Sequence, residues 1–158
     1  MNAPLATIAP CCAADDAEPI AGFSRCHEGI LQHLSSLAGL PALAEAAARS
    51  RQGAGETLRF FRATVFEHHQ EEERELFPAV LASAAPGAEC DQVQAIVSQL
   101  TQEHREVEAA FEALEPSLKR LAKGHDAALS GTELATQVIA LVTRYEEHAH
   151  YEENEFLP

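Results

Sequence analysis

The chain has 158 residues, of which 46% are hydrophobic, and its formal net charge is −14. This length is enough for one domain with an apolar core, and the abundance of Ala, Leu and Glu favours helices over sheets. A surface this acidic repels nucleic acids and anionic membranes, so we expect neither as a partner.

The first 19 residues are predicted to form a flexible arm, because they contain three prolines and many alanines without helical periodicity. They lack the basic and apolar regions of a signal peptide, and no stretch of the chain approaches the roughly 18 apolar residues of a membrane span. The cysteines at positions 11, 12, 26 and 90 have no regular spacing and suit free thiols in a reducing compartment. We therefore expect a cytoplasmic protein.

Four amphipathic helices are predicted after the arm. The first begins near Phe23, is interrupted at 39–41 by Gly-Leu-Pro, and ends at the glycines of 52–55. The second covers residues 56–83 and leads into a Pro-Gly turn.

The third helix is predicted over residues 91–123, where Pro116 is expected to produce a kink or a brief break. A turn at 124–126 follows. The fourth helix opens with Ser-Gly-Thr-Glu at 130–133, a capping-box pattern. Because strand patterns are absent, residues 20–158 are predicted to be all-α and to form an antiparallel up-down-up-down four-helix bundle.

Each predicted helix carries one histidine on its apolar stripe, at spacings of three and four residues: His27, His68, His104 and His148. In antiparallel helices, residues equally far from the turn lie at the same height. His68 and His104 are centred on position 86 and His104 and His148 on position 126, so both pairs are centred on predicted turns. His27 and His68 are centred between positions 47 and 48, and the interruption at 39–41 would absorb the difference.

Two glutamates, Glu72 and Glu152, continue the same inward stripes. An ionised carboxylate inside an apolar bundle costs several kcal/mol, and no Lys or Arg lies on a stripe at that level to neutralise it. A pair of divalent metal ions would supply the charge. The spacing His-x-x-x-Glu presents an imidazole and a carboxylate one turn apart on one face, and this donor mixture without thiolates favours iron or manganese over a structural zinc site.

An internal repeat supports a paired site. The segment HHQEEERELFP at 68–78 aligns without gaps with HAHYEENEFLP at 148–158. Chance similarity between two Glu-rich helix ends is the alternative, but the matches include both inward positions. Two hairpins, each with an isolated His and a His-x-x-x-Glu, predict a pseudo-symmetric dinuclear centre.

With these motifs in this order, residues 20–158 resemble the hemerythrin-like, or HHE cation-binding, domain family. The resemblance implies a four-helix bundle that holds two iron ions, bridged by an oxo or hydroxo group. The ligands implied are the isolated histidines and the two His-x-x-x-Glu motifs, namely His27, His68, Glu72, His104, His148 and Glu152. Family members bind dioxygen, sense oxygen or iron, handle nitric oxide, or repair damaged iron centres.

The chain departs from the oxygen-carrying members in two places. They have a second His one turn after the His of the third helix, where this chain has Glu108, and they end in His-x-x-x-x-Asp rather than His-x-x-x-Glu. Either Glu108 or His69 would then complete the metal shell, or a coordination position stays open to an exogenous ligand. The pattern is closer to the sensing and repair members than to a specialised oxygen carrier.

Three functions are compatible with these observations. The leading hypothesis is a di-iron protein that binds or senses a small diatomic ligand or peroxide, as a monomer or homodimer. The second is an enzyme that uses the same centre, such as a peroxidase, an oxidase or a nitric-oxide or iron-centre repair catalyst, with Tyr145 as a redox-active candidate. The third is a metal-stabilised interaction module without chemistry.

Overall fold

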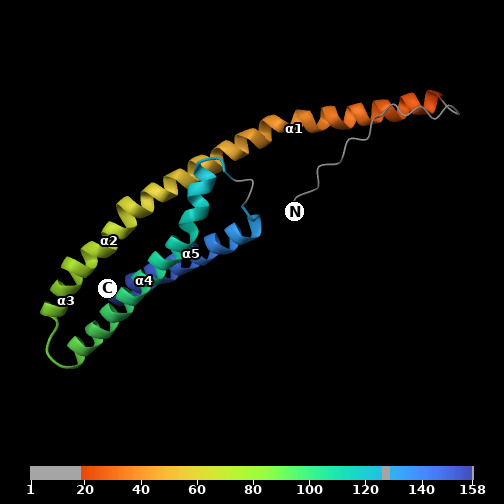
Figure 1. Cartoon of the computed structure of the whole chain (residues 1–158). Helices are drawn as coiled ribbons and strands as arrows, with labels where there is room; N and C mark the ends of the chain where they lie inside the picture. Colours follow the sequence, from red (N-terminus) through yellow and green to blue (C-terminus); the bar gives the residue numbers. More distant parts are fainter. Residues whose placement is uncertain (1–18, 126–128, 158) are drawn as a thin grey trace. The chain divides into compact units, whose positions relative to one another are not determined.

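The computed structural model describes residues 19–125 and 129–157, and every regular element in these ranges is helical (Figure 1). Helix α1 spans Pro19–Phe60, and four shorter elements continue it without a loop: η1 (Phe61–Val65), α2 (Phe66–Glu71), η2 (Glu72–Leu76) and α3 (Phe77–Ser83). The remaining elements are α4 (Ala88–Ala122), α5 (Gly131–Tyr151) and η4 (Glu152–Phe156). The elements labelled η are π-helical turns.

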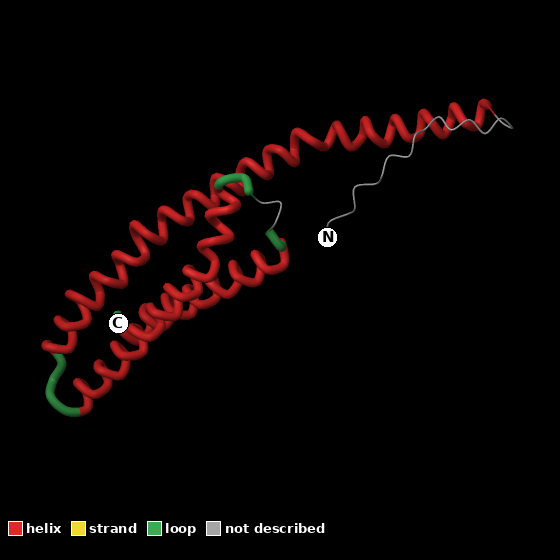
Figure 2. The backbone as a smooth tube through the Cα atoms, in the orientation of Figure 1, coloured by secondary structure: helices red, strands yellow, loops and turns green. Residues whose placement is uncertain are grey.

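The chain divides into two compact units, Met1–Ala47 and Ala48–Pro158. In the second unit, the helical segment that ends at Ser83, α4 and α5 run in alternating directions, as the backbone trace in Figure 2 shows. This arrangement accounts for the second to fourth predicted helices. Within the described ranges, no helix is both long and apolar enough to cross a membrane. The predicted arm, with Cys11 and Cys12, falls outside the described residues except for Pro19, where α1 begins.

The predicted turns and cap that bound α4 and α5 are present. Gly87 and Gly124 have φ values of 104° and 72°, a region that favours glycine, and they lie at the start and end of α4. The hydroxyl of Ser130 accepts a hydrogen bond from the backbone N–H of Glu133 at 3.3 Å and so caps α5.

Helix α1 contradicts two predictions, because it passes through Pro41 and through Gly53 and Gly55 without a break. The proline removes one backbone hydrogen bond, but the Ala-rich residues 42–50 that follow are strong helix formers. Neither Gly53 nor Gly55 has a positive φ, so neither acts as a helix stop. Of the two alternatives expected at Pro116, the brief break does not occur, because α4 continues through this residue to Ala122.

Two apolar clusters form the core of the second unit. The larger joins α1, α4 and α5 and consists of Ala54, Val107, Phe111, Leu114, Leu118 and Leu141. At its centre, Phe61 stacks on Phe111 with ring centroids 4.5 Å apart. The smaller cluster consists of Phe77, Ile96 and Leu100. On α4, Leu100 and Val107 are seven residues apart, about two turns, and His104 lies between them, about one turn from each.

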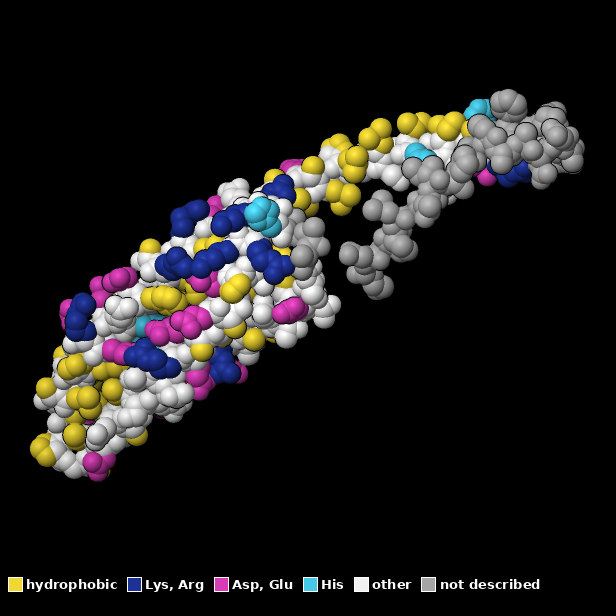
Figure 3. All heavy atoms as spheres, in the orientation of Figure 1, with side chains coloured by type: hydrophobic (Ala, Val, Ile, Leu, Met, Phe, Trp, Pro, Cys, Tyr) yellow, Lys and Arg dark blue, Asp and Glu magenta, His cyan; other side chains and the backbone are white. Residues whose placement is uncertain are grey.

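Charged side chains of both signs are interleaved over the surface of the second unit, and apolar side chains follow the visible part of α1 (Figure 3). Ion pairs cross between helices: Arg62 pairs with Glu115, and Arg144 pairs with Glu106. Exposed pairs of this kind contribute about 0–1 kcal/mol each, so the apolar clusters dominate the stability.

Candidate metal centre

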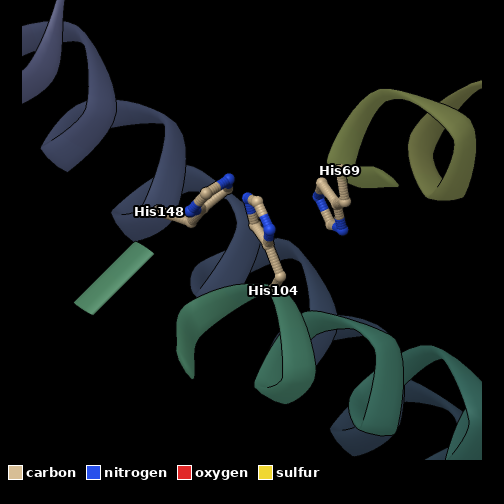
Figure 4. Close-up of side chains that lie close together, drawn as sticks. All are labelled: His69, His104 and His148. Carbon is tan, nitrogen blue, oxygen red and sulfur yellow. The ribbon is translucent and has the colours of Figure 1, made fainter. Parts of the chain in front are cut away.

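Three buried histidines from three helices meet in the interior of the second unit. His69 comes from α2, His104 from α4 and His148 from α5, and their rings converge in Figure 4. Their exposed fractions are 0%, 0% and 2%. His69 stacks on His104 with ring centroids 4.0 Å apart, and the ring of His148 lies edge-on to His104 at 4.9 Å. Each offers one nitrogen, and these nitrogens lie within 4.8 Å of one another, a separation that suits a shared metal ion.

A second group consists of His68, Glu72 and Glu152, whose donor atoms also lie within 4.8 Å of one another. Both carboxylates are buried, while the side chain of His68 is 48% exposed. Glu72 connects this group to the first one. Its Oε1 lies 3.2 Å from Nε2 of His68, and its Oε2 lies 3.2 Å from Nε2 of His104.

The interior contains polar atoms that the protein does not satisfy. Both ring nitrogens of His69, Nε2 of His104 and Oε2 of Glu72 are buried without a hydrogen-bond partner. Each such atom costs about 1–3 kcal/mol, so four in one place call for a further ligand. No Lys or Arg belongs to the buried side chains of the described residues. A divalent cation fits this combination of imidazole nitrogens and carboxylate oxygens.

Burial sets the protonation of the histidines. It lowers the pKa of His69 to about 3, with help from His104 and His148, and it also lowers the pKa of His148. Burial acts in the same direction on His104, but the adjacent carboxylates of Glu72 and Glu73 raise the pKa of His104 overall. His69 and His148 are therefore neutral near pH 7, which is the form that binds metals.

The two buried carboxyl groups differ although they occupy equivalent places in the repeat. Burial and the neighbouring Glu72 raise the pKa of Glu152 to about 7. Burial pushes the pKa of Glu72 upward as well, but the interactions of Glu72 with His104 and Glu152 lower it overall. In the metal-free protein Glu72 thus carries the negative charge and Glu152 shares a proton with it.

Five of the six ligands implied by the resemblance, all except His27, belong to these two groups in the second unit. His27 lies on α1 in the first unit, so the groups described here are those of the second unit alone. Of the two alternatives for completing the shell, His69 lies among the donors. Glu108 lies at the edge, where it is bound by Arg105 at 3.2 Å and approaches Nδ1 of His69 at 3.5 Å.

The structure differs from the predicted stripe at His68 and Leu76, which are partly exposed, while the following residues His69 and Phe77 are buried. His69 lies four residues after the buried Val65 and three before the buried Glu72, so spacings of three and four admit His69 as well as His68. Phe77 lies five residues after Glu72, because the π-helical turn η2 between them includes one more residue than an α turn and rotates the side chains after it by about one position, or ~100°.

An open cleft of about 450 Å³ lies beside the second group. It is lined by His68, Glu71, Glu72, Glu75, Leu76 and Ala79. One side of the carboxylate-rich group is therefore accessible to a small ligand.

Comparison with family models gives a match to the hemerythrin HHE cation-binding domain over residues 18–158. The comparisons with curated proteins and with solved structures found no match. The match covers both units, including His27, and all the donors described above.

Proposed function

Because the chain belongs to the hemerythrin family of HHE cation-binding domains, we propose that it holds two iron ions and binds or senses dioxygen, nitric oxide or peroxide. The observation that carries this proposal is the set of four unpartnered buried polar atoms on His69, His104 and Glu72. Apolar packing alone does not explain them, and a cation-binding family supplies the reason.

The two groups of donors suggest one ion each. His69, His104 and His148 would supply nitrogen ligands to one ion, and His68 with Glu152 would bind the other. Glu72 would bind both ions; its two oxygens lie 3.2 Å from Nε2 of His68 and from Nε2 of His104. When bound, the ions would provide the redox-active centre to which a diatomic molecule or peroxide coordinates.

The surrounding residues would control access to this centre. Val107 and Leu100 are fully buried on either side of His104 and exclude water from the histidine group. Tyr145 lies against His148, with ring centroids 6.0 Å apart, and continues the apolar wall. The cleft beside Glu72 leaves the carboxylate side open, so an exogenous ligand would enter there.

We further propose that residues 19–47 provide the fourth helix of the bundle and that His27 is a seventh ligand. Two observations support this. The stripe of His27 exposes Ile30, Leu34 and Leu37, and α5 exposes Val138, Ile139 and Val142. Exposed apolar rows on amphipathic helices indicate packing surfaces.

The test is metal content with an optical spectrum after anaerobic loading with Fe²⁺, recorded before and after exposure to oxygen and to nitric oxide. Two irons per chain and a spectrum that changes with either gas are expected. If Zn²⁺ stabilises the fold as well as Fe²⁺ does and neither gas changes the spectrum, the chain is a metal-stabilised interaction module instead.

A further inference from the structure

Two glutamates just outside the donor groups contact the outer nitrogens of the metal-facing histidines. Oε1 of Glu73 lies 2.9 Å from Nδ1 of His104, and Oε2 of Glu103 lies 3.2 Å from Nδ1 of His148. Each pair joins different helices, since Glu73 is in η2 and Glu103 is in α4. Both contacts therefore connect a histidine to the neighbouring helix.

The chemistry of each contact favours an imidazole proton at Nδ1. For His104, the contact with Glu73 has hydrogen-bond geometry, whereas the contact of Nε2 with Glu72 does not. An ionised carboxylate can only accept a hydrogen bond, so the Nδ1 atom must donate. In a neutral ring the other nitrogen, Nε2, then carries a lone pair. Nε2 of His104 is the atom that faces Glu72 and has no hydrogen-bond partner.

Both glutamates are themselves held in place. Arg105 binds the second oxygen of Glu73, and the side-chain amide of Gln99 donates to Oε1 of Glu103 at 2.9 Å. Their side chains are only 24% and 23% exposed. A carboxylate anchored at one oxygen orients the group at its other oxygen more firmly than a mobile surface residue would.

We propose that Glu73 and Glu103 are positioning residues of the metal centre, which hold His104 and His148 in the Nδ1–H tautomer and aim Nε2 at the ion. The proposal rests on the proposed metal binding. It gives a role to the second Glu of the Glu72-Glu73 pair and to the Glu that precedes His104, two positions that lie next to ligands in sequence but are not ligands themselves.

His69 provides an internal contrast. Its Nδ1 lies 3.5 Å from Oε1 of Glu108 and makes no hydrogen bond, so neither ring nitrogen is assigned a proton by a neighbour. The tautomer of His69 should therefore respond to neither of the two positioning glutamates.

The experiment compares Glu73→Gln and Glu103→Gln with Glu112→Gln, which removes the same charge from an exposed position on α4. In metal-free protein at alkaline pH, the ¹⁵N chemical shifts of the imidazole nitrogens report the tautomer of each neutral ring. The wild type and the Glu112 variant should have His104 and His148 protonated at Nδ1. Because an amide both donates and accepts, Glu73→Gln should mix the tautomers of His104 alone, and Glu103→Gln those of His148 alone.

Titration with Fe²⁺ under anaerobic conditions, and with Zn²⁺, gives the second measurement. Each positioning variant should bind about 10- to 100-fold more weakly than the Glu112 variant. Protonation of both rings at Nε2 in the wild type, or affinities equal to that of Glu112→Gln, would overturn the proposal. Since the tautomers are read without metal, a wild type that binds neither metal would refute the proposed function separately.

Discussion

Glu72 and Glu152 bring carboxylate oxygens within 4.8 Å of each other inside the second unit, and each is the first residue of a π-helical turn. The two turns, η2 and η4, fall at the same place in the repeated segments 68–78 and 148–158. The repeat is therefore present in the structure as well as in the sequence. Its effect is to bury two acidic groups close together, which costs free energy unless a cation or a proton neutralises them.

The first prediction concerns the pH dependence of the metal-free protein. The pKa of Glu152 is about 7 in the folded chain against an ordinary 4.5, so the folded state binds the proton more tightly. The stability contributed by this group is complete below pH 4.5 and is lost as the pH rises through 7. Glu152→Gln removes this pH dependence. The free energy of unfolding of the variant, relative to that of the wild type, should therefore rise by about 2–3 kcal/mol between pH 5 and pH 8.

Urea unfolding of both proteins across this pH range measures the difference. The lowered pKa of His69 makes the stability of both proteins rise with pH up to about 6.5, opposite to the effect of Glu152. This contribution cancels when the free energy of unfolding of the wild type is subtracted from that of the variant. A gap between variant and wild type that stays constant with pH would contradict a shared proton at Glu152.

A second prediction separates the two donor groups. His69→Ala should remove the ion bound by the three histidines, and His68→Ala should remove the other, so each variant should retain about one iron per chain. Glu72→Ala should weaken both, because its oxygens face both groups. Metal analysis after gel filtration gives the stoichiometries. Retention of two irons by His69→Ala would show that the buried ring is only a packing residue.

The core supports a third prediction. Phe111 is 1% exposed, stacks on Phe61 and meets the ring of Phe66 edge-on with centroids 5.5 Å apart. Phe111→Ala should lower the free energy of unfolding by about 3–5 kcal/mol. Phe60→Ala is the matched control, because Phe60 is 57% exposed and should cost less than about 1 kcal/mol. If both variants lost the same free energy of unfolding, Phe111 would not be a central residue of the core.

A fourth prediction tests whether residues 19–47 pack as a helix of the bundle. Leu34 lies on the stripe of His27, while Leu43, nine residues later, lies on the opposite face of α1, and both are exposed in the structure. If the stripe packs, Leu34→Glu should lower the free energy of unfolding of the iron-loaded protein by about 1.5–3 kcal/mol, and Leu43→Glu should be close to neutral. Thermal unfolding of the iron-loaded protein, with the loss of bound iron recorded as a second signal, measures the stability of each variant. Equal, small effects would contradict the proposed fourth helix.

The sequence predicts much of the second unit correctly because its signals there are local. The Ser130 cap, the glycine turns at both ends of α4 and the helical spacing of His104 with Leu100 and Val107 need no knowledge of distant contacts. In α1 the same kind of signal failed, because Pro41 and two glycines lower helix propensity without preventing a helix.

Spacing alone does not separate His69 from His68, because His69 lies four residues after the buried Val65 and His68 lies three. The burial of Phe77 instead of Leu76 depends on the π turn at Glu72–Leu76, which arises where a helix adjusts to its packing partners and has no sequence signature of its own. The useful signal was chemical. An additional imidazole beside a His-x-x-x-Glu motif, in a chain where Glu108 replaces a histidine, marked the position as an alternative donor.

The most direct test of the central claim is the iron content of anaerobically loaded protein, compared between the wild type and the double variant Glu72→Gln, Glu152→Gln. Two irons per chain in the wild type, and less than one in the variant at the same free Fe²⁺ concentration, are predicted. Wild-type protein that is folded but retains no iron would contradict the account, because the buried glutamates would then be tolerated without a cation.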